Sequence, residues 1–226
     1  MSSPRTAFVK PSRSEVPFAA VAAYSPRGDS PVAVRSRDLV RQVKENRVVS
    51  SSGRSETTVA LIARRVRELR LPFANDFLGP DITLVPVPRS ALQKPGALWP
   101  ANEIAIALHR EGFGARVLPC LARAIAVPKA ATSQSHERPK ARVHFESLDL
   151  RDPIDLPQTI TIVDDIVTRG AQLFGAAWRI WAARPDITVR AFAVIRTISD
   201  PSDFTAIGDP CTGVIEWRNE GCRRTP

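Results

Sequence analysis

Cysteine is scarce in this sequence, with three residues among 226, namely Cys120, Cys211 and Cys222. They lie far apart, their number is odd, and no pair has the Cys-x-x-Cys spacing. A disulfide framework needs paired cysteines, and a structural zinc site needs ligands at short intervals. The pattern therefore argues against both, and it is typical of a protein in a reducing cytoplasm.

Long apolar runs are also absent, because arginine, lysine or aspartate interrupts each candidate. A helix that crosses a membrane needs about 20 consecutive apolar residues, so we expect no membrane span. The N-terminus has basic residues without an apolar core behind them, so we expect no signal peptide. Residues 1–16 are rich in serine, proline and charge, which predicts a disordered arm followed by a single domain over 17–226.

Acidic residues are in deficit, with 23 Asp and Glu against 32 Lys and Arg and a net charge of +9. This imbalance favours polyanionic partners, either nucleic acid or a small ligand that carries several phosphates. The alternative is that the charge only keeps the surface soluble.

Strand and helix patterns alternate along the chain. Helical spacing of apolar residues is clearest around 59–69, where Arg64, Arg65, Arg67 and Arg70 form the expected solvated face. Residues 50–53 predict a linker-like break, and 122–146 a long loop with a fragment of helix. The other expected helices cover 37–47, 101–110 and 171–183, and the expected strands cover 18–24, 81–87, 116–121, 159–163, 189–198 and 214–217.

This alternation predicts parallel pairing through right-handed crossovers. We therefore expect an α/β fold with a mainly parallel twisted sheet flanked by helices. Ligands of such sheets bind beyond the carboxyl ends of the strands. Residues 86–90 and the acids Asp164 and Asp165 follow two of the expected strands at that end.

The segment 160–171, ITIVDDIVTRGA, carries most of the functional information. Its turn at Thr168 and Gly170 presents backbone N–H groups at the start of an expected helix, an arrangement that suits a phosphate. Asp164 and Asp165 would repel a phosphate, but they can accept hydrogen bonds from hydroxyls or hold Mg²⁺ through water. A ribose 5-phosphate unit fits both features, because it has a phosphate for the turn and vicinal hydroxyls for the acids. The alternative is that the acids only stabilise the N-terminus of the helix.

These residues resemble the ribose-phosphate signature of the type I phosphoribosyltransferases, in which two acids and two apolar residues precede Thr-Thr-Gly. Residues 84–109 are similar to the VPVP segment, loop and helix of the ComF-like (competence protein F-like) subgroup, and residues 133–145 resemble the Arg-rich segment that follows there. The resemblance covers most of 83–198. The chain departs from the pattern at Arg169 and Gln172, where threonine is usual, and it lacks the N-terminal zinc module.

The resemblance implies the type I phosphoribosyltransferase fold, with a core at about 55–198 and a small hood from the N-terminal segment, residues 199–226 or both. It implies phosphoribosyl diphosphate or a nucleoside monophosphate as ligand and Mg²⁺ as cofactor. Asp164 and Asp165 would be the catalytic pair, meeting the ribose hydroxyls and, indirectly, the metal. The remaining implied roles are a 5-phosphate cradle of Thr168, Arg169, Gly170, Ala171 and Gln172, diphosphate binding by Arg89 and Ser90, and a lid with Lys129, Arg138 and Lys140.

Two functions follow from this reading. The first is a phosphoribosyltransferase that transfers the phosphoribosyl group to an unidentified acceptor and releases diphosphate. The second is a non-catalytic nucleotide-sensing or nucleic-acid-binding regulatory protein on the same fold, which the departures from the signature and the basic charge favour. The oligomeric state is open, although phosphoribosyltransferases commonly form homodimers.

Overall fold

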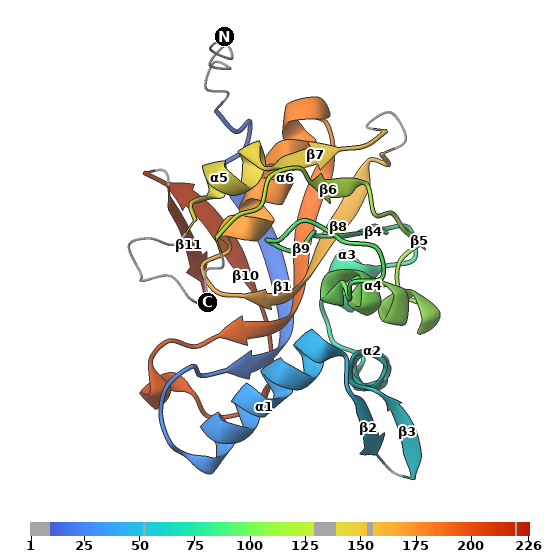
Figure 1. The fold of residues 1–226 in the computed structure, drawn as a ribbon, viewed down its shortest axis with the longest axis vertical. Helices are drawn as coiled ribbons and strands as arrows, with labels where there is room; N and C mark the ends of the chain where they lie inside the picture. The colour runs from blue at the N-terminus through green and yellow to red at the C-terminus, as the bar shows by residue number, and fades with distance from the viewer. Residues whose placement is uncertain (1–9, 52, 129–138, 153–155, 220) are drawn as a thin grey trace.

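A seven-stranded sheet forms the centre of the computed structural model, which describes residues 10–51, 53–128, 139–152, 156–219 and 221–226. Its strands are β1 (Glu15–Tyr24), β4 (Thr83–Pro86), β5 (Arg116–Val117), β8 (Thr159–Val167), β9 (Thr188–Thr197), β10 (Gly208–Arg218) and β11 (Gly221–Thr225). Their order is β11-β10-β1-β9-β8-β4-β5 (Figure 1). Neighbours from β1 to β5 pair in parallel, and β10 and β11 add antiparallel strands. The expected mainly parallel α/β sheet is confirmed.

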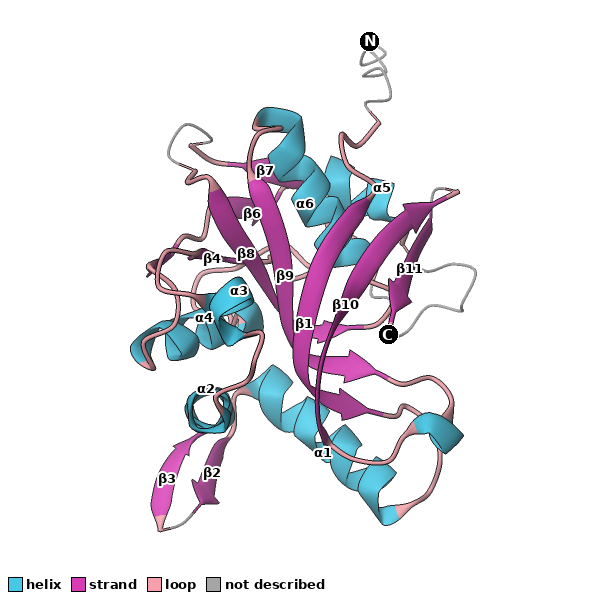
Figure 2. Cartoon of the chain, turned by 180° about the vertical axis from the view of Figure 1, so that it is seen from behind, coloured by secondary structure: helices cyan, strands magenta, loops and turns pink. Residues whose placement is uncertain are grey.

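Helices cover both faces of this sheet. On one face lie α5 (Ala141–Glu146) and α6 (Ala171–Ala183) (Figure 1). Helix α6 buries Phe174, Trp178 and Trp181 in the core on this face. The other face carries the remaining α-helices, and α2, α3 and α4 lie together beside the β4–β8 half of the sheet (Figure 2). These helices are α1 (Pro31–Glu45), α2 (Thr58–Leu69), α3 (Ala74–Leu78) and α4 (Pro100–Arg110).

Burial on both faces explains why β8 and β9 could be predicted. Residues 160–164 of β8 are all buried, and β9 is buried over 191–195. Strands of a covered parallel sheet read as nearly continuous apolar runs, which is the pattern in both segments. Helix α6 coincides with the expected range 171–183.

The N-terminal elements begin earlier than expected. Strand β1 starts at Glu15, so residues 15 and 16 belong to the sheet and not to the arm, whose residues 1–9 lie outside the described part of the chain. Helix α1 starts at Pro31 and not at residue 37, because the Ser30 hydroxyl accepts a hydrogen bond from the Ala33 N–H at 3.2 Å. A serine cap followed by proline is a helix start that the apolar pattern does not reveal.

The break expected at 50–53 is wrong. Residues 50 and 51 belong to β2 (Val48–Ser51), which forms a hairpin with β3 (Arg54–Thr57), paired from Val48↔Thr57 to Ser51↔Arg54. The hairpin was missed because its strands are polar and half-exposed or exposed. The short helix α3, with five residues, was missed as well.

The strand expected over 116–121 is wrong in its second half. Strand β5 ends at Val117, and β6 (Leu121–Arg123) pairs with β7 (Leu148–Leu150) in a separate two-stranded sheet. The expected loop at 122–146 therefore begins in β6 and contains α5, the helical fragment. Residues 129–138 of this loop lie outside the described residues.

The C-terminal segment holds more strand than expected. Residues 214–217 are the middle of the 11-residue strand β10, and β11 follows it at the edge of the sheet. Much of 199–226, one of the two expected hood segments, therefore extends the main sheet. Among the described residues, no helix is long and apolar enough to cross a membrane.

Candidate functional site

The acidic pair lies inside a strand and not after it. We expected the strand to end at Val163, but β8 continues through Asp164 and Asp165 to Val167. Strand β4 stops at Pro86, level with Val163, whereas β9 stays paired with β8 as far as Val167↔Arg196. Strand β8 thus projects past the end of β4, and the pair still lies at the carboxyl end of the parallel strands.

Asp164 is buried, with 5% of its surface exposed. Its Oδ1 accepts the N–H of Asp165 at 2.9 Å, and its Oδ2 accepts a hydrogen bond from Gln172 Nε2 at 3.1 Å. Burial raises the pKa of this carboxyl well above its ordinary value, and the neighbouring charge of Asp165 adds to the effect. The contact with Gln172 joins the acidic pair directly to the start of α6.

Asp165 is more open, with 17% of its side chain exposed. Its Oδ1 accepts the N–H of Ile166 at 2.9 Å, and its Oδ2 lies 3.3 Å from Nζ of Lys44 in α1. Sequence reasoning missed Lys44, because a lysine in the last turn of a helix needs no partner beyond the helix dipole. A ligand hydroxyl or a cation at this pair must compete with Lys44 and with Gln172.

The turn between β8 and α6 has the backbone that an anion cradle requires. Gly170 adopts a φ of +85°, in the left-handed region, and a Cβ there would lie 2.5 Å from Cγ2 of Ile215. No side chain of the described residues caps the first turn of α6. Thr168, Ala171 and Gln172 are partly exposed and Arg169 is exposed, so the amides of this turn lie near the surface. The structure thus brings the five expected cradle residues together beside Asp164.

Arg224 of β11 supports this turn, and sequence reasoning missed it. Its Nε donates to the carbonyl of Thr168 at 2.8 Å and its Nη2 to the carbonyl of Thr197 at 2.6 Å. The hydroxyls of the two threonines are 2.9 Å apart. Burial, followed by the nearby charge of Arg196, lowers the pKa of Arg224 to about 10.

The loop after β4 carries the expected diphosphate residues. Arg89 is exposed, and its Nη1 donates to the carbonyl of Leu98 at 2.9 Å across the base of the loop. The carbonyl of Ser90 accepts the N–H of Val127 at 2.8 Å. Among the described residues, no hydrogen bond or ion pair joins Arg89 or Ser90 to the acidic pair.

Arg123 of β6 holds the start of the loop after β4. It is buried, with 6% exposed, and donates to the carbonyl of Arg89 at 2.9 Å, the carbonyl of Pro88 at 3.2 Å and the hydroxyl of Ser147 at 2.5 Å. Burial lowers the pKa of Arg123 to about 10, while the nearby Asp164 acts in the opposite direction. A buried guanidinium therefore holds the start of the loop after β4, and the negative charge of Asp164 favours its protonated form.

The lid residues are only partly described. Lys129 and Arg138 lie outside the described residues, and Lys140 is exposed immediately before α5. The described residues contain no group of three His, Cys, Asp or Glu that could hold a metal. Asp164 and Asp165 supply carboxylate oxygens, which fit a Mg²⁺ ion whose other ligands are water and substrate phosphates.

Two surface cavities lie away from these residues. One of about 490 Å³ is lined by Pro17, Phe73 and Phe77 with part of β10, and one of about 170 Å³ lies between α4 and the start of α2. Neither is lined by the acidic pair or the cradle. A sugar phosphate held by the turn after β8 would bind at the carboxyl end of the parallel strands and not in either cavity.

Comparison of the sequence with protein-family models gives no match, and comparison with curated proteins gives none either.

Proposed function

We propose that the chain is a phosphoribosyltransferase-like enzyme of the ComF-like type. It binds phosphoribosyl diphosphate with Mg²⁺, transfers the phosphoribosyl group to an acceptor and releases diphosphate. The observation that carries the proposal is the geometry of residues 164–172. Two acids in the last part of β8 precede a turn with no side-chain cap at the start of α6, and the side-chain amide of Gln172 in α6 donates to Asp164.

Each part of this geometry has a task in the proposed reaction. The amides of 169–172 hold the 5-phosphate, and the acids accept hydrogen bonds from the ribose hydroxyls. Positive charge develops on the sugar as its bond to diphosphate breaks, and fixed carboxylates nearby stabilise it. When bound, Mg²⁺ stabilises the negative charge of the leaving diphosphate.

Binding also requires an exchange of partners at the acids. Lys44 and Gln172 satisfy Asp165 and Asp164 in the free protein. These contacts keep Asp165 ion-paired and Asp164 hydrogen-bonded in the free protein. The ribose hydroxyls replace them when the ligand binds. Arg89, released from the carbonyl of Leu98, then supplies positive charge for the diphosphate.

The proposal is tested by calorimetry with phosphoribosyl diphosphate and Mg²⁺. The double variant Asp164→Asn/Asp165→Asn is expected to abolish binding, whereas the control Asp81→Asn, on an exposed aspartate, retains it. Undiminished binding in the double variant rules out this site. Diphosphate release in the presence of a panel of bases and amines then identifies the acceptor class.

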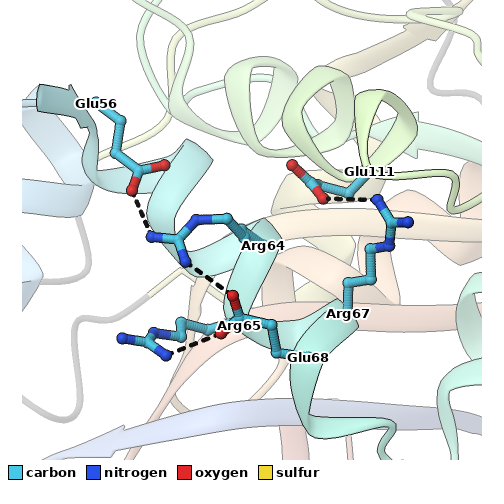
Figure 3. Close-up of polar contacts among 6 residues, drawn as sticks. All are labelled: Glu56, Arg64, Arg65, Arg67, Glu68 and Glu111. Carbon is cyan, nitrogen blue, oxygen red and sulfur yellow. Dashed lines mark hydrogen bonds and ion pairs between the residues drawn. The ribbon is translucent and has the colours of Figure 1, made fainter. Parts of the chain in front are cut away.

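The second candidate, a nucleic-acid-binding regulator, has the net charge of +9 in its favour. The arginines of α2 give it little support, because acidic neighbours pair with several of them (Figure 3). Arg64 lies 2.6 Å from Glu56 and 2.8 Å from Glu68, and Arg67 lies 3.4 Å from Glu111. A mobility-shift titration with nucleic acid tests this candidate, because a nucleic-acid-binding protein binds at low salt and its affinity for nucleic acid falls steeply as the salt concentration rises. Absence of binding at low salt removes this candidate.

A further inference from the structure

We propose that Arg224 is a positioning residue of the cradle, which fixes the orientation of the peptide group between Thr168 and Arg169. The proposal rests on the proposed function, because it assigns a role within the same site. It adds the C-terminal strand β11 to a site that the sequence places wholly between residues 86 and 172.

The side chain of Arg224 contacts the first residue of the cradle, Thr168. Its guanidinium donates to the carbonyl of Thr168, at 2.8 Å, and to the carbonyl of Thr197 at the end of β9, at 2.6 Å. Its Nη1 also donates to the main-chain oxygen of Pro226, the last residue of the sequence, at 2.5 Å, and the guanidinium lies 5.5 Å from the centre of the Phe18 ring. Among the described residues, no Asp or Glu side chain forms an ion pair with Arg224, so oxygens of the main chain are its polar partners.

Fixing the carbonyl of Thr168 also fixes the amide that follows it. The peptide group is planar and trans, so its C=O and N–H point in opposite directions. When Arg224 holds the carbonyl, the N–H of Arg169 is directed to the side of the turn away from β11. A hydrogen bond from a charged donor also polarises the peptide, which strengthens its N–H as a donor to an anion.

The other end of the same turn rests on the same hairpin. Ile215 of β10 is the cross-strand partner of Arg224, and it packs so closely on Gly170 that a Cβ there would lie 2.5 Å from its Cγ2. Arg224 and Ile215 thus support the residues on either side of Arg169. The hairpin of β10 and β11 therefore sets the shape of the cradle as well as the edge of the sheet.

The test compares Arg224→Gln with Arg223→Gln, which removes the same charge one residue away. Arg223 is exposed and lies opposite Glu216. Calorimetry with Mg²⁺ measures the Kd of ribose 5-phosphate and, separately, of diphosphate. We expect Arg224→Gln to weaken ribose 5-phosphate roughly tenfold, about 1.4 kcal/mol, and to leave diphosphate unchanged. Arg223→Gln is expected to change neither, and Arg224→Lys to restore part of the loss, since lysine can still donate to one carbonyl.

A second readout does not depend on any ligand. The backbone amide resonance of Arg169 in ¹H–¹⁵N spectra of the free protein is expected to shift in Arg224→Gln and to stay in place in Arg223→Gln. An unmoved resonance overturns the proposal, and so does an equal loss of affinity for ribose 5-phosphate and diphosphate. If the wild-type protein binds no ribose 5-phosphate, the proposed function fails, while the resonance still decides whether Arg224 orients this peptide.

Discussion

At Asp164, the requirements of folding and of ligand binding oppose each other. The carboxyl is buried beside a second acid, and its pKa is raised by that burial. Its hydrogen-bond partners are a backbone N–H and the amide of Gln172. A side chain kept for stability alone would not need the charge, because an asparagine can accept the same N–H, and Gln172 can turn its amide to match.

We therefore expect Asp164→Asn to stabilise the protein at neutral pH, by about 1 kcal/mol, a usual size for a single substitution. The folded-state pKa lies above the unfolded value near 3.8, so wild-type stability falls as pH rises above that value. The gain in the variant should therefore be absent near pH 3.8 and grow at higher pH. Urea unfolding at several pH values measures it. A variant that is less stable than wild type at neutral pH contradicts the prediction.

Arg123 should tolerate lysine poorly, although the charge is kept. Its guanidinium donates hydrogen bonds to two successive carbonyls, those of Pro88 and Arg89, and to the hydroxyl of Ser147. A lysine ammonium is a compact charge that cannot span the three acceptors. We expect Arg123→Lys to cost about 2 kcal/mol of unfolding free energy, the size of a lost hydrogen bond to a charged group. Arg110→Lys, on an exposed arginine of α4, is the control, and equal unfolding midpoints for the two variants would refute the expectation.

The acids, the cradle and the loop after β4 could be read from the sequence because each is a local pattern. Lys44, Arg123 and Arg224 could not, because each joins the site from a distant segment. The bonds of Arg123 to Pro88 and of Arg224 to Thr168 span 35 and 56 residues. Only the folded sheet brings these cations to the site.

At the scale of elements, the apolar pattern predicted the strands that are buried on both faces of the sheet. It failed where backbone pairing or a helix cap determines where an element begins or ends. Strand β8 was expected to end at Val163, before the first acid, but its pairing with β9 carries it to Val167. The hairpin β2–β3 is polar, so its strands have no apolar pattern, and its backbone pairing alone defines it. Helix α6 was predicted over its full length because Gly170 gives it a clear start.

Gly170 should tolerate a side chain poorly, for two reasons that can be measured separately. Its φ is +85°, which disfavours a side chain, and a Cβ would also meet Ile215 at 2.5 Å. Gly112 has a φ of +89° with nothing within 4 Å of an added Cβ, so Gly112→Ala measures the backbone cost alone. We expect about 1 kcal/mol for Gly112→Ala and roughly 1–3 kcal/mol more for Gly170→Ala, from overpacking. Chemical unfolding of both variants checks this, and equal losses would show that Ile215 yields freely.

At the scale of the whole molecule, one segment before residues 160–172 and one after them contact the acidic pair and the turn that follows it. Helix α1 supplies Lys44 to Asp165, and β11 supplies Arg224 to the turn before α6. Alternation of strands and helices predicted the parallel part of the sheet. It could not predict the antiparallel β10 and β11, whose residues are mostly half-exposed or exposed. Ligand binding at the cradle should therefore depend on elements outside the segment that resembles a known signature.

The pH dependence of global stability should reflect a second buried group near this site. His144 is 4% exposed, and its Nδ1 has no hydrogen-bond partner. Burial, and after it the charge of Arg123, lowers the pKa of His144 from 6.5 to about 4. Between these values the unfolded chain binds a proton that the folded protein does not, so stability falls as pH drops through this range. The trend is opposite to that of Asp164, whose contribution falls as pH rises.

The loss assigned to His144 should reach about 3 kcal/mol when the pH has fallen to its folded-state pKa, at about 1.4 kcal/mol per unit of pKa. We expect His144→Gln to flatten the slope of unfolding free energy between pH 6.5 and 4, because glutamine takes up no proton in either state. His109→Gln, on the exposed end of α4, is the matched control for the loss of an imidazole that is not buried. Urea titrations across this range provide the measurement. If His144→Gln and wild type lose stability in parallel as the pH falls, acid sensitivity arises from other groups, and His144 takes up its proton equally in the folded and unfolded protein.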